Sequence, residues 1–559
     1  MATPSTEAPP VPEYRKARGF PFRLRQNTLV YLEDRNFLEG FRALDNLLTG
    51  GNSQRLPRGE FPPAFTPFPQ QLILATTLVV HPQFTTRARS PEDLQASNQA
   101  LFFVRNVLRI VGPVNAKFGE VFALSPNVFT KARKQARRRN QDTDSTSSDE
   151  EQYDLDSPFA HQQSVFAQKK DFWQIVGWAF TCSVAHKQRW NRWKLWLAFA
   201  LDLLEADFRL RWKLTSESGH PIHVEDSIIM QYLAGAKNEE GGRNGRRDIM
   251  NAVLADGKNG QHKFSEVWKD ETKERKVKEE ELTAPKKVNL DEDEWGDYDF
   301  EADQDEVTDR EIGSPESDES TTDTDEREEE EYGGLEAILL RQRIFGLLCE
   351  VACNCTVQFT SLEDVFDIFT EFFRPLPLPV FTSLINKFPL SSDNQCALLV
   401  NLCLPFLATT YANINVFAIS QDRLIRDFFP YAANSNSALE NAKFSRLIQT
   451  LLRKMWGGNR LDPFDPDLRT SIERGIAARK AKAIGDGRTK DKGQNRAEAE
   501  AKKLLEYSAE SILAILEQLK IQAGMPVYSD TGAGAKGPLL SSQLSSVADE
   551  DVDDDTLMD

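Results

Sequence analysis

Acidic residues in this chain are concentrated in three short stretches, and these stretches limit which parts of it can fold. Residues 291–331 contain 22 acidic residues and two arginines. Residues 142–156 and 549–559 contain seven acidic residues each and no basic residue. Because such sequence has too little apolar surface to offset the entropy of ordering, we expect it to be disordered. The net charge of the whole chain is −18, so the residues outside these stretches carry about +16 and form a basic body.

The rest of the chain is apolar enough to build real cores, with 35 phenylalanines and nine tryptophans among 559 residues. We predict three helical segments, at residues 26–130, 157–290 and 333–522. The regions around them are predicted to be disordered, namely an N-terminal tail (1–25), a basic-then-acidic linker (131–156), an acidic tract (291–332) and an acidic C-terminal tail (523–559).

Strand signals are scarce, so the predicted fold class is mostly α. We expect an irregular multi-helix body, with a solenoid-like arrangement left open, interrupted by disordered acidic linkers. Residues 27–48 fit one helix, and Ser90 and Ser437 are typical helix caps. Residues 71–80 fit either a buried strand or a buried helix. The alternating prolines of residues 374–381 predict an extended connector.

Six tryptophans lie between residues 173 and 212, the densest aromatic cluster of the chain. Trp190 and Trp193 share a helical stripe with leucines, which favours use in the core. The interleaved basic residues also allow a second interpretation, in which the indoles stack on nucleic-acid bases. We favour the core and expect four basic residues to form its solvated rim: Lys187, Arg189, Arg192 and Lys194.

A basic cluster at residues 131–139 predicts nuclear localisation. Its six positive charges fit the acidic groove of an import receptor, and contact with a nucleic-acid backbone is the alternative. The residues that carry this prediction are Lys131, Arg133, Lys134, Arg137, Arg138 and Arg139.

Several serines match simple kinase patterns, because acidic residues or a proline follow them. A phosphate on any of them would add about −1.5 to −2 charge to regions that are mostly acidic already. The predicted phosphorylation sites are Ser147, Ser148, Ser157, Ser314 and Ser317.

The six cysteines favour free thiols over a metal site. Cys349, Cys353 and Cys355 form one run, and Cys396 and Cys403 lie further along. Their neighbours are apolar, and the repeated short knuckles typical of zinc sites are not formed. We therefore predict no metal, no cofactor and buried thiols in a reducing compartment.

Two glycine-rich motifs resemble ligand-binding sites, but for each we favour an interpretation without a ligand. Residues 532–537 match the Gly-x-Gly-x-x-Gly fingerprint but follow no apolar strand, so we interpret the match as accidental. Residues 241–247 combine glycines and arginines and could hold an anion at a helix start, although a flexible connection is favoured.

Membrane association is not predicted. Residues 396–419 are uncharged and apolar, but several asparagines and a proline within them favour buried core helices over a membrane span. The polar, proline-rich N-terminus predicts no signal peptide.

Taken together, these features predict a non-enzymatic nuclear scaffold, a subunit of a chromosome-maintenance, chromatin or ribosome-assembly complex. Its acidic tracts would bind basic partners such as histones, or screen its own basic surface. The alternative is direct binding of nucleic acid by the basic body. An enzyme is the third class, for which the sequence offers no nucleophile, base and orienting group that belong together.

Overall fold

A computed structural model describes most of the chain between residues 14 and 524. The described ranges are 14–56, 61–123, 155–218, 222–237, 241–257, 264–273, 332–386, 388–407, 414–483 and 492–524.

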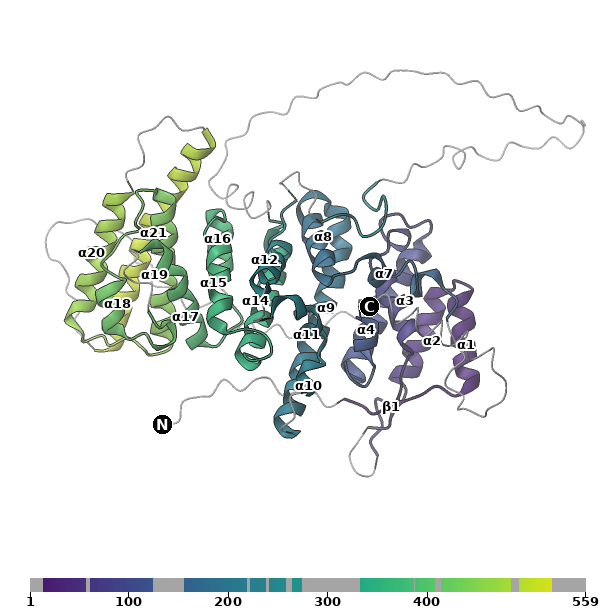
Figure 1. Ribbon diagram of the computed structural model, residues 1–559. Coiled ribbons are helices and arrows are strands. Elements are labelled where there is room, and N and C mark those ends of the chain that lie inside the picture. Colours follow the sequence, from purple (N-terminus) through teal and green to yellow (C-terminus); the bar gives the residue numbers. More distant parts are fainter. Residues whose placement is uncertain are drawn as a thin grey trace, which may run out of the picture.

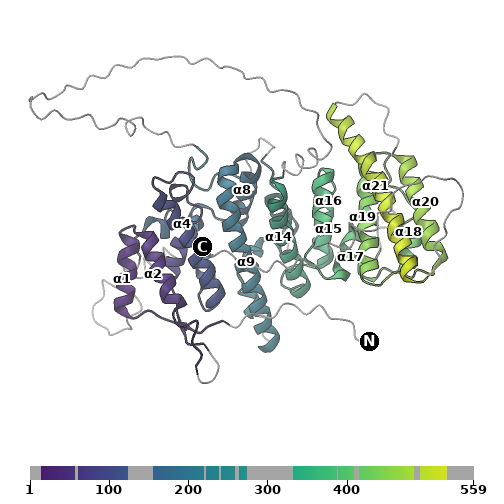
Figure 2. The same ribbon diagram turned by 180° about the vertical axis from the view of Figure 1, so that it is seen from behind.

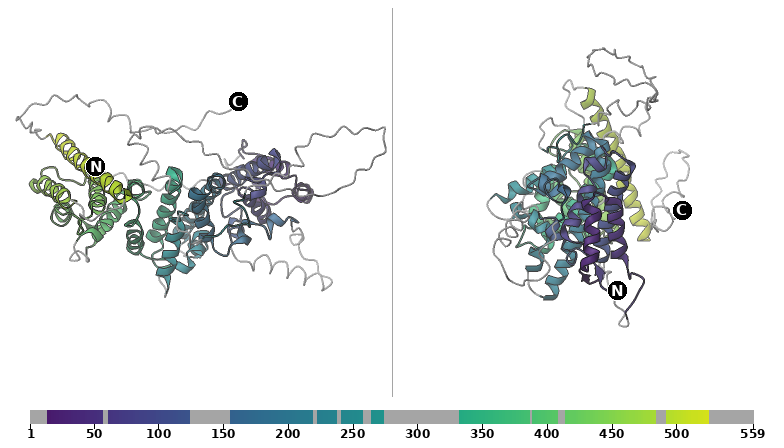
Figure 3. Two further views of the ribbon diagram at one scale, coloured as in Figure 1. Left: turned by 90° about the horizontal axis from the view of Figure 1, so that it is seen from above. Right: turned by 90° about the vertical axis from the view of Figure 1, so that its right-hand side faces the viewer.

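The protein is all-α, as predicted, and its helices form an elongated array (Figure 1). The described residues contain 19 α-helices and only two strands. These strands, β1 (Ala17–Arg18) and β2 (Ala64–Phe65), pair in parallel. Helices follow one another along the array in approximately chain order, with α1 at one end and α20 at the other, and the view from behind shows the same order (Figure 2). Seen from above, the body is much longer along the array than across it (Figure 3).

The N-terminal part begins earlier than predicted, because residues 14–25, assigned to a tail, form β1 and the start of α1. The predicted single helix at residues 27–48 is two helices, separated by a turn in which Arg35 has φ of 61°. Residues 71–80 are helical up to Leu78 and all buried, which explains why periodicity could not assign them. The helices of this part are α1 (Phe22–Glu33), α2 (Phe37–Thr49), α3 (Pro69–Leu78), η1 (Pro82–Phe84), α4 (Pro91–Ile110) and α5 (Phe118–Val121).

The middle part contains the tryptophan cluster, which lies in the core as favoured. Trp190, Trp193 and Trp196 are all buried on the long helix α9. The helices of this part are η2 (Pro158–Ala160), α7 (Val165–Gln168), α8 (Phe172–Ala185), α9 (Lys187–Ser218), α10 (Ile222–Glu225), α11 (Ile228–Tyr232), η3 (Ala234–Ala236) and α12 (Gly242–Val253).

The C-terminal part corrects the prediction for residues 374–381. Instead of an extended connector, residues 374–376 form a turn and α16 begins at Leu378. Pro379 is tolerated because the first turn of a helix has no intrahelical partner for its N–H. The helices are α14 (Gly334–Asn354), α15 (Leu362–Phe373), α16 (Leu378–Asn386), α17 (Ser392–Cys403), η5 (Leu404–Phe406), η7 (Val416–Ala418), α18 (Gln421–Asp427), α19 (Ala438–Gly457), α20 (Pro466–Lys482) and α21 (Lys492–Gln522).

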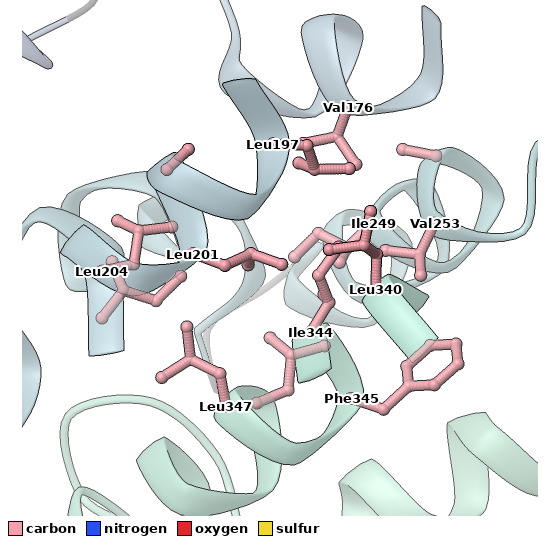
Figure 4. Packing of buried hydrophobic residues seen from close by; sticks show 14 of the residues in the cluster. Val176, Leu197, Leu201, Leu204, Ile249, Val253, Leu340, Ile344, Phe345 and Leu347 are labelled. Carbon is pink, nitrogen blue, oxygen red and sulfur yellow. The ribbon is translucent and has the colours of Figure 1, made fainter. Parts of the chain in front are cut away.

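One hydrophobic core connects all three parts. A continuous cluster of buried side chains runs from Phe20 to Leu519. Figure 4 shows its central region, where α8, α9, α12 and α14 meet. The residues labelled there are Val176, Leu197, Leu201, Leu204, Ile249, Val253, Leu340, Ile344, Phe345 and Leu347. The predicted segments are therefore parts of one body.

Polar contacts reinforce the junction between α9 and α14. Arg343 reaches Asp202 at 2.7 Å and Glu205 at 3.0 Å, and Arg209 reaches Glu350 at 2.9 Å. These pairs are partly exposed, so each adds at most about 1 kcal/mol, and they fix the register of the two helices more than their stability.

The uncharged stretch at residues 396–419 contributes the buried helix α17, which is 12 residues long. Within the described ranges, no helix has both the length and the apolar character needed to cross a membrane.

Candidate anion-binding pocket

A cavity of about 320 Å³ opens near the N-terminal end of the array, where three chain segments meet. The segments are the turn from η1 to the start of α4, the residues leading into and through α7, and residues 268–269. The lining residues are His81, Pro82, Gln83, Arg87, Arg89, Gln163, Gln168, Trp268 and Lys269.

A buried ion pair beneath the cavity holds two of its walls together. Arg189, on α9, donates through Nη2 to Glu271 Oε2 at 2.7 Å, and the two side chains are 2% and 0% exposed. The same guanidinium donates to the carbonyl of Val80 at 2.7 Å and to Thr85 Oγ1 at 3.0 Å. Arg189 therefore joins the turn around η1 to residues 264–273.

The predicted position of Arg189 on a solvated rim is wrong, because this guanidinium is fully buried. Lys187 is exposed, and Arg192 and Lys194 are half-buried, as a rim position requires. The helical stripe alone gives no sign that Arg189 has a partner 82 residues away.

The floor of the cavity is aromatic. The ring of His81 meets the indole of Trp268 edge-on, with centroids 4.9 Å apart, and that indole stacks on Trp193 at 6.0 Å. The indole Nε1 of Trp268 donates to the carbonyl of Gln163 at 3.0 Å. Trp193 covers one face of Trp268 and the indole is only 6% exposed, so the ring forms the floor and offers little surface for stacking.

His81 is neutral near pH 7. Burial, aided by the positive charge of Arg189, lowers the pKa of His81 from 6.5 to about 3. Its Nδ1 accepts a hydrogen bond from the backbone N–H of Gln83 at 3.3 Å. The charge of the cavity therefore comes from other residues.

Three cationic side chains, those of Arg87, Arg89 and Lys269, line the cavity. The guanidinium of Arg87 donates to the backbone carbonyl of Asp270 at 3.2 Å. Among the described residues, no carboxylate lies within 4.0 Å of the side-chain nitrogens of these three cations. This leaves three formal positive charges at one concave surface.

The nearest acidic groups are engaged elsewhere. The carboxylate of Asp270 pairs with Lys273 at 2.7 Å, and this pair, together with the nearby charges of Lys269 and Arg87, lowers the pKa of Asp270. Asp93 accepts backbone N–H groups of Arg89 and Ser90 at 3.0 and 3.1 Å, as part of the cap of α4. An anion entering the cavity would therefore meet three cations without a direct ion pair in the described structure, although Asp270 offsets part of the charge of Arg87 and Lys269.

This arrangement is suited to holding an anion. Guanidinium groups form bidentate, charge-assisted hydrogen bonds with phosphate or carboxylate oxygens, and a lysine ammonium adds a mobile third donor. The exposed amides of Gln83 and Gln163 offer donors and acceptors beside these charges.

The flexible connection favoured for residues 241–247 is wrong, because α12 begins at Gly242, and the guanidiniums of the alternative anion site contact the protein's own groups. Arg243 and Arg247 both pair with Glu371, and Arg246 donates to the carbonyl of Ala236 at 2.9 Å. These guanidiniums hold the start of α12 against α15 and η3.

The six cysteines are free thiols, as predicted, and five of them are buried; for Cys353, which is exposed, the predicted burial is wrong. Burial raises the pKa of Cys355 to about 11 and raises that of Cys349 further above its usual range. Across the part of the chain that the structure covers, no three His, Cys, Asp or Glu side chains gather as metal ligands would.

Most residues of the predicted regulatory sites lie outside the described residues. This applies to the basic cluster of Lys131, Arg133, Lys134, Arg137, Arg138 and Arg139, and to Ser147, Ser148, Ser314 and Ser317. Ser157 is described, is 3% exposed and precedes η2. A kinase would reach its hydroxyl only after this segment moved away from the core, so phosphorylation at Ser157 stays a prediction.

The anion-binding pocket itself could not be found by motif, because its residues come from three separate segments. The only hint in the sequence is the density of cations at residues 87–89 beside a strong helix cap. Comparison with known proteins does not identify the chain: no family model, no curated protein and no solved structure matches it.

Proposed function

We propose that this protein is a non-enzymatic nuclear scaffold, a subunit of a chromosome-maintenance, chromatin or ribosome-assembly complex. The observation that carries the proposal is the elongated helical array with one continuous core. An extended body of this kind offers a large surface on which several partners can bind side by side.

The distribution of charge supports a role in binding. The acidic stretches at 142–156, 291–331 and 549–559 can attract basic proteins such as histones or screen the chain's own basic surface. The basic cluster at residues 131–139 can bind an import receptor and so bring the scaffold to the nucleus.

Nuclear localisation is tested with a fluorescent fusion of the full chain. Replacing all six basic residues of 131–139 by Ala should move the fusion from the nucleus to the cytoplasm. A matched control replaces cations of a mixed-charge stretch by Ala: Arg275, Lys276, Lys278, Lys286 and Lys287. The control should stay nuclear, and nuclear accumulation of the first variant would overturn this step.

The scaffold role is tested by affinity purification of the full chain from nuclear extract, with and without residues 291–331. Stoichiometric protein partners should co-purify, and basic ones such as histones should be lost on deletion. Purification of the chain alone would contradict the proposal. If deletion instead strengthens binding to DNA or RNA, with a steep dependence on salt, the protein is a nucleic-acid-binding protein that its acidic tract inhibits.

A further inference from the structure

We propose that the anion-binding pocket holds a phosphorylated serine or threonine within an acidic peptide. This inference rests on the proposed function, because it gives the chemistry of one class of partner that the scaffold would bind. Three features of the pocket support it: its charge, its aromatic floor and its amide groups.

The charge of the pocket matches a phosphate better than a single carboxylate. Arg87, Arg89 and Lys269 bring three cationic groups to a cavity of about 320 Å³. A phosphorylated side chain carries about −1.5 to −2 charge and three strong acceptor oxygens. Two guanidiniums and one ammonium can bond these three oxygens together and be left with a net charge of about +1, whereas one carboxylate would leave about +2.

Buried contacts hold the framework of the pocket in place. Arg189 and Glu271 fix both walls, and the carbonyl of Asp270 orients Arg87. By contrast, Arg209 and Arg343, elsewhere on the body, bind carboxylates of the protein itself. Arg87 is held in place before a ligand binds, whereas the exposed side chains of Arg89 and Lys269 would become ordered on binding.

The floor and rim favour a peptide over a nucleic acid. Trp268 is only 6% exposed and its indole already stacks on Trp193, so it has little surface left to stack on a base. The amides of Gln83 and Gln163 can instead bond the N–H and C=O groups of residues beside the phosphate.

The chain's own sequence contains a segment of the required chemistry. Ser147 and Ser148 are followed by three acidic residues, at 149–151. A synthetic peptide of residues 142–156, phosphorylated at both serines, is therefore a suitable probe for this ligand class. The natural source of the phosphate is either this segment or a partner protein with similar sequence.

The test measures binding of the labelled probe to unphosphorylated full-length protein by fluorescence anisotropy at about 0.1 M salt, where long-range charge effects are screened beyond roughly 10 Å. The phosphorylated peptide should bind at least about tenfold more tightly than the unphosphorylated one. The double variant R89Q/K269Q should lose about tenfold or more in affinity for the phosphorylated probe. Within the described structure these two side chains form no hydrogen bond or ion pair, so their replacement should leave folding intact.

A matched control removes the same charge from a different place. Arg105 and Arg109 are exposed on α4 and do not line the pocket. The variant R105Q/R109Q should change the affinity by less than about twofold. Equal loss in both variants, or equal binding of the two peptides, would show an effect of net charge alone and would overturn the proposal. So would a single-stranded oligonucleotide that binds with the same dependence on Arg89 and Lys269.

The source of the phosphate is distinguished by phosphorylating the full chain at Ser147 and Ser148 before adding the probe. Weaker binding assigns the pocket to the chain's own segment, and unchanged binding assigns it to a partner. This result is independent of the scaffold test. If no partner co-purifies, the affinity of the purified protein for the phosphorylated peptide can still be measured. If the peptide does not bind, the proposals of nuclear localisation and partner recruitment are unaffected.

Discussion

Arg189 and Glu271 form an ion pair that is closed to solvent and joins segments 82 residues apart in the chain. Removing either partner would leave a buried charge without compensation, at a cost of about 3–5 kcal/mol in the free energy of unfolding. The variants R189M and E271Q should each lower the denaturant midpoint, measured by circular dichroism. The double variant should cost at least about 2 kcal/mol less than the sum of the two. Additive effects would mean that the pair is not coupled.

His81 should make stability depend on pH. The unfolded chain takes up this proton near pH 6.5, but the folded protein does so only at a pKa of about 3. The stability that the folded protein gains from keeping His81 neutral is therefore fully present above pH 6.5, and it is lost as the pH falls from 6.5 towards 3. Between pH 7 and pH 5.5 the loss is about 1 kcal/mol from this group.

The variant H81N isolates this contribution, because Asn keeps an acceptor for the N–H of Gln83 but does not titrate. Its unfolding free energy should fall less steeply than that of the wild type over the same pH range. Identical slopes would assign the pH dependence to other groups, such as His186, whose pKa burial also lowers.

Arg341 should stabilise the fold through its buried hydrogen bonds to backbone carbonyls. Its guanidinium is fully buried and donates to the carbonyls of Val253, Tyr332 and Ala255 at 2.8, 2.6 and 2.9 Å. Desolvation lowers the pKa of Arg341 to about 9. The variant R341M leaves three carbonyls without their donor, so we expect a loss of at least about 3 kcal/mol in denaturant unfolding.

The control for Arg341 lies on the same helix. The variant R343M removes only partly exposed ion pairs with Asp202 and Glu205, and it should cost about 1 kcal/mol or less. A similar loss in both variants would refute the special role of Arg341.

Gly346 should not tolerate a side chain, whereas Gly457 should. A Cβ at Gly346 would lie 2.2 Å from Cγ of Pro389, and a Cβ at Gly457 would meet nothing within 4 Å. Overpacking should outweigh the gain in helix propensity, so G346A should lower stability by about 1–2 kcal/mol. G457A should be neutral or more stable by up to about 1 kcal/mol in the same thermal unfolding assay. The reverse order would contradict the packing of α14.

Thiol labelling should distinguish Cys353 from the other five cysteines, because it alone is exposed. In the native protein, maleimide should modify one thiol, and in denaturant all six should react. The variant C353S should show no rapid labelling in the native state. Rapid reaction of a second thiol would mean that the region around it opens easily, α8 for Cys182 or the α14–α17 region for the other four.

Much of the fold was predictable because local chemistry determines where helices begin. The hydroxyls of Ser90 and Ser437 cap α4 and α19 by accepting the backbone N–H three residues on, as their sequence context indicates. Residues 71–80 were ambiguous because a helix buried on every side has no periodic polar face. The prolines near Leu378 misled the prediction because one of them falls in a first helical turn.

The pocket was not predictable because its chemistry depends on distant pairs. An arginine in an amphipathic stripe is normally solvated, and only the burial of Glu271 against it makes Arg189 part of the core. Likewise, Arg87 and Lys269 become neighbours only when residues 264–273 fold back onto η1. Sequence periodicity contains no information about such contacts.

The order of the helices along the array also has a mechanical consequence. Most helices pack against others that are close in sequence, so a small rotation at each junction adds to the next along the body. We expect the two ends to be able to change their separation without any single interface breaking. The junction that Arg341 ties together, between the start of α14 and the end of α12, should bend least. Two partners bound near α1 and α20 would be held by an elastic rather than a rigid tether.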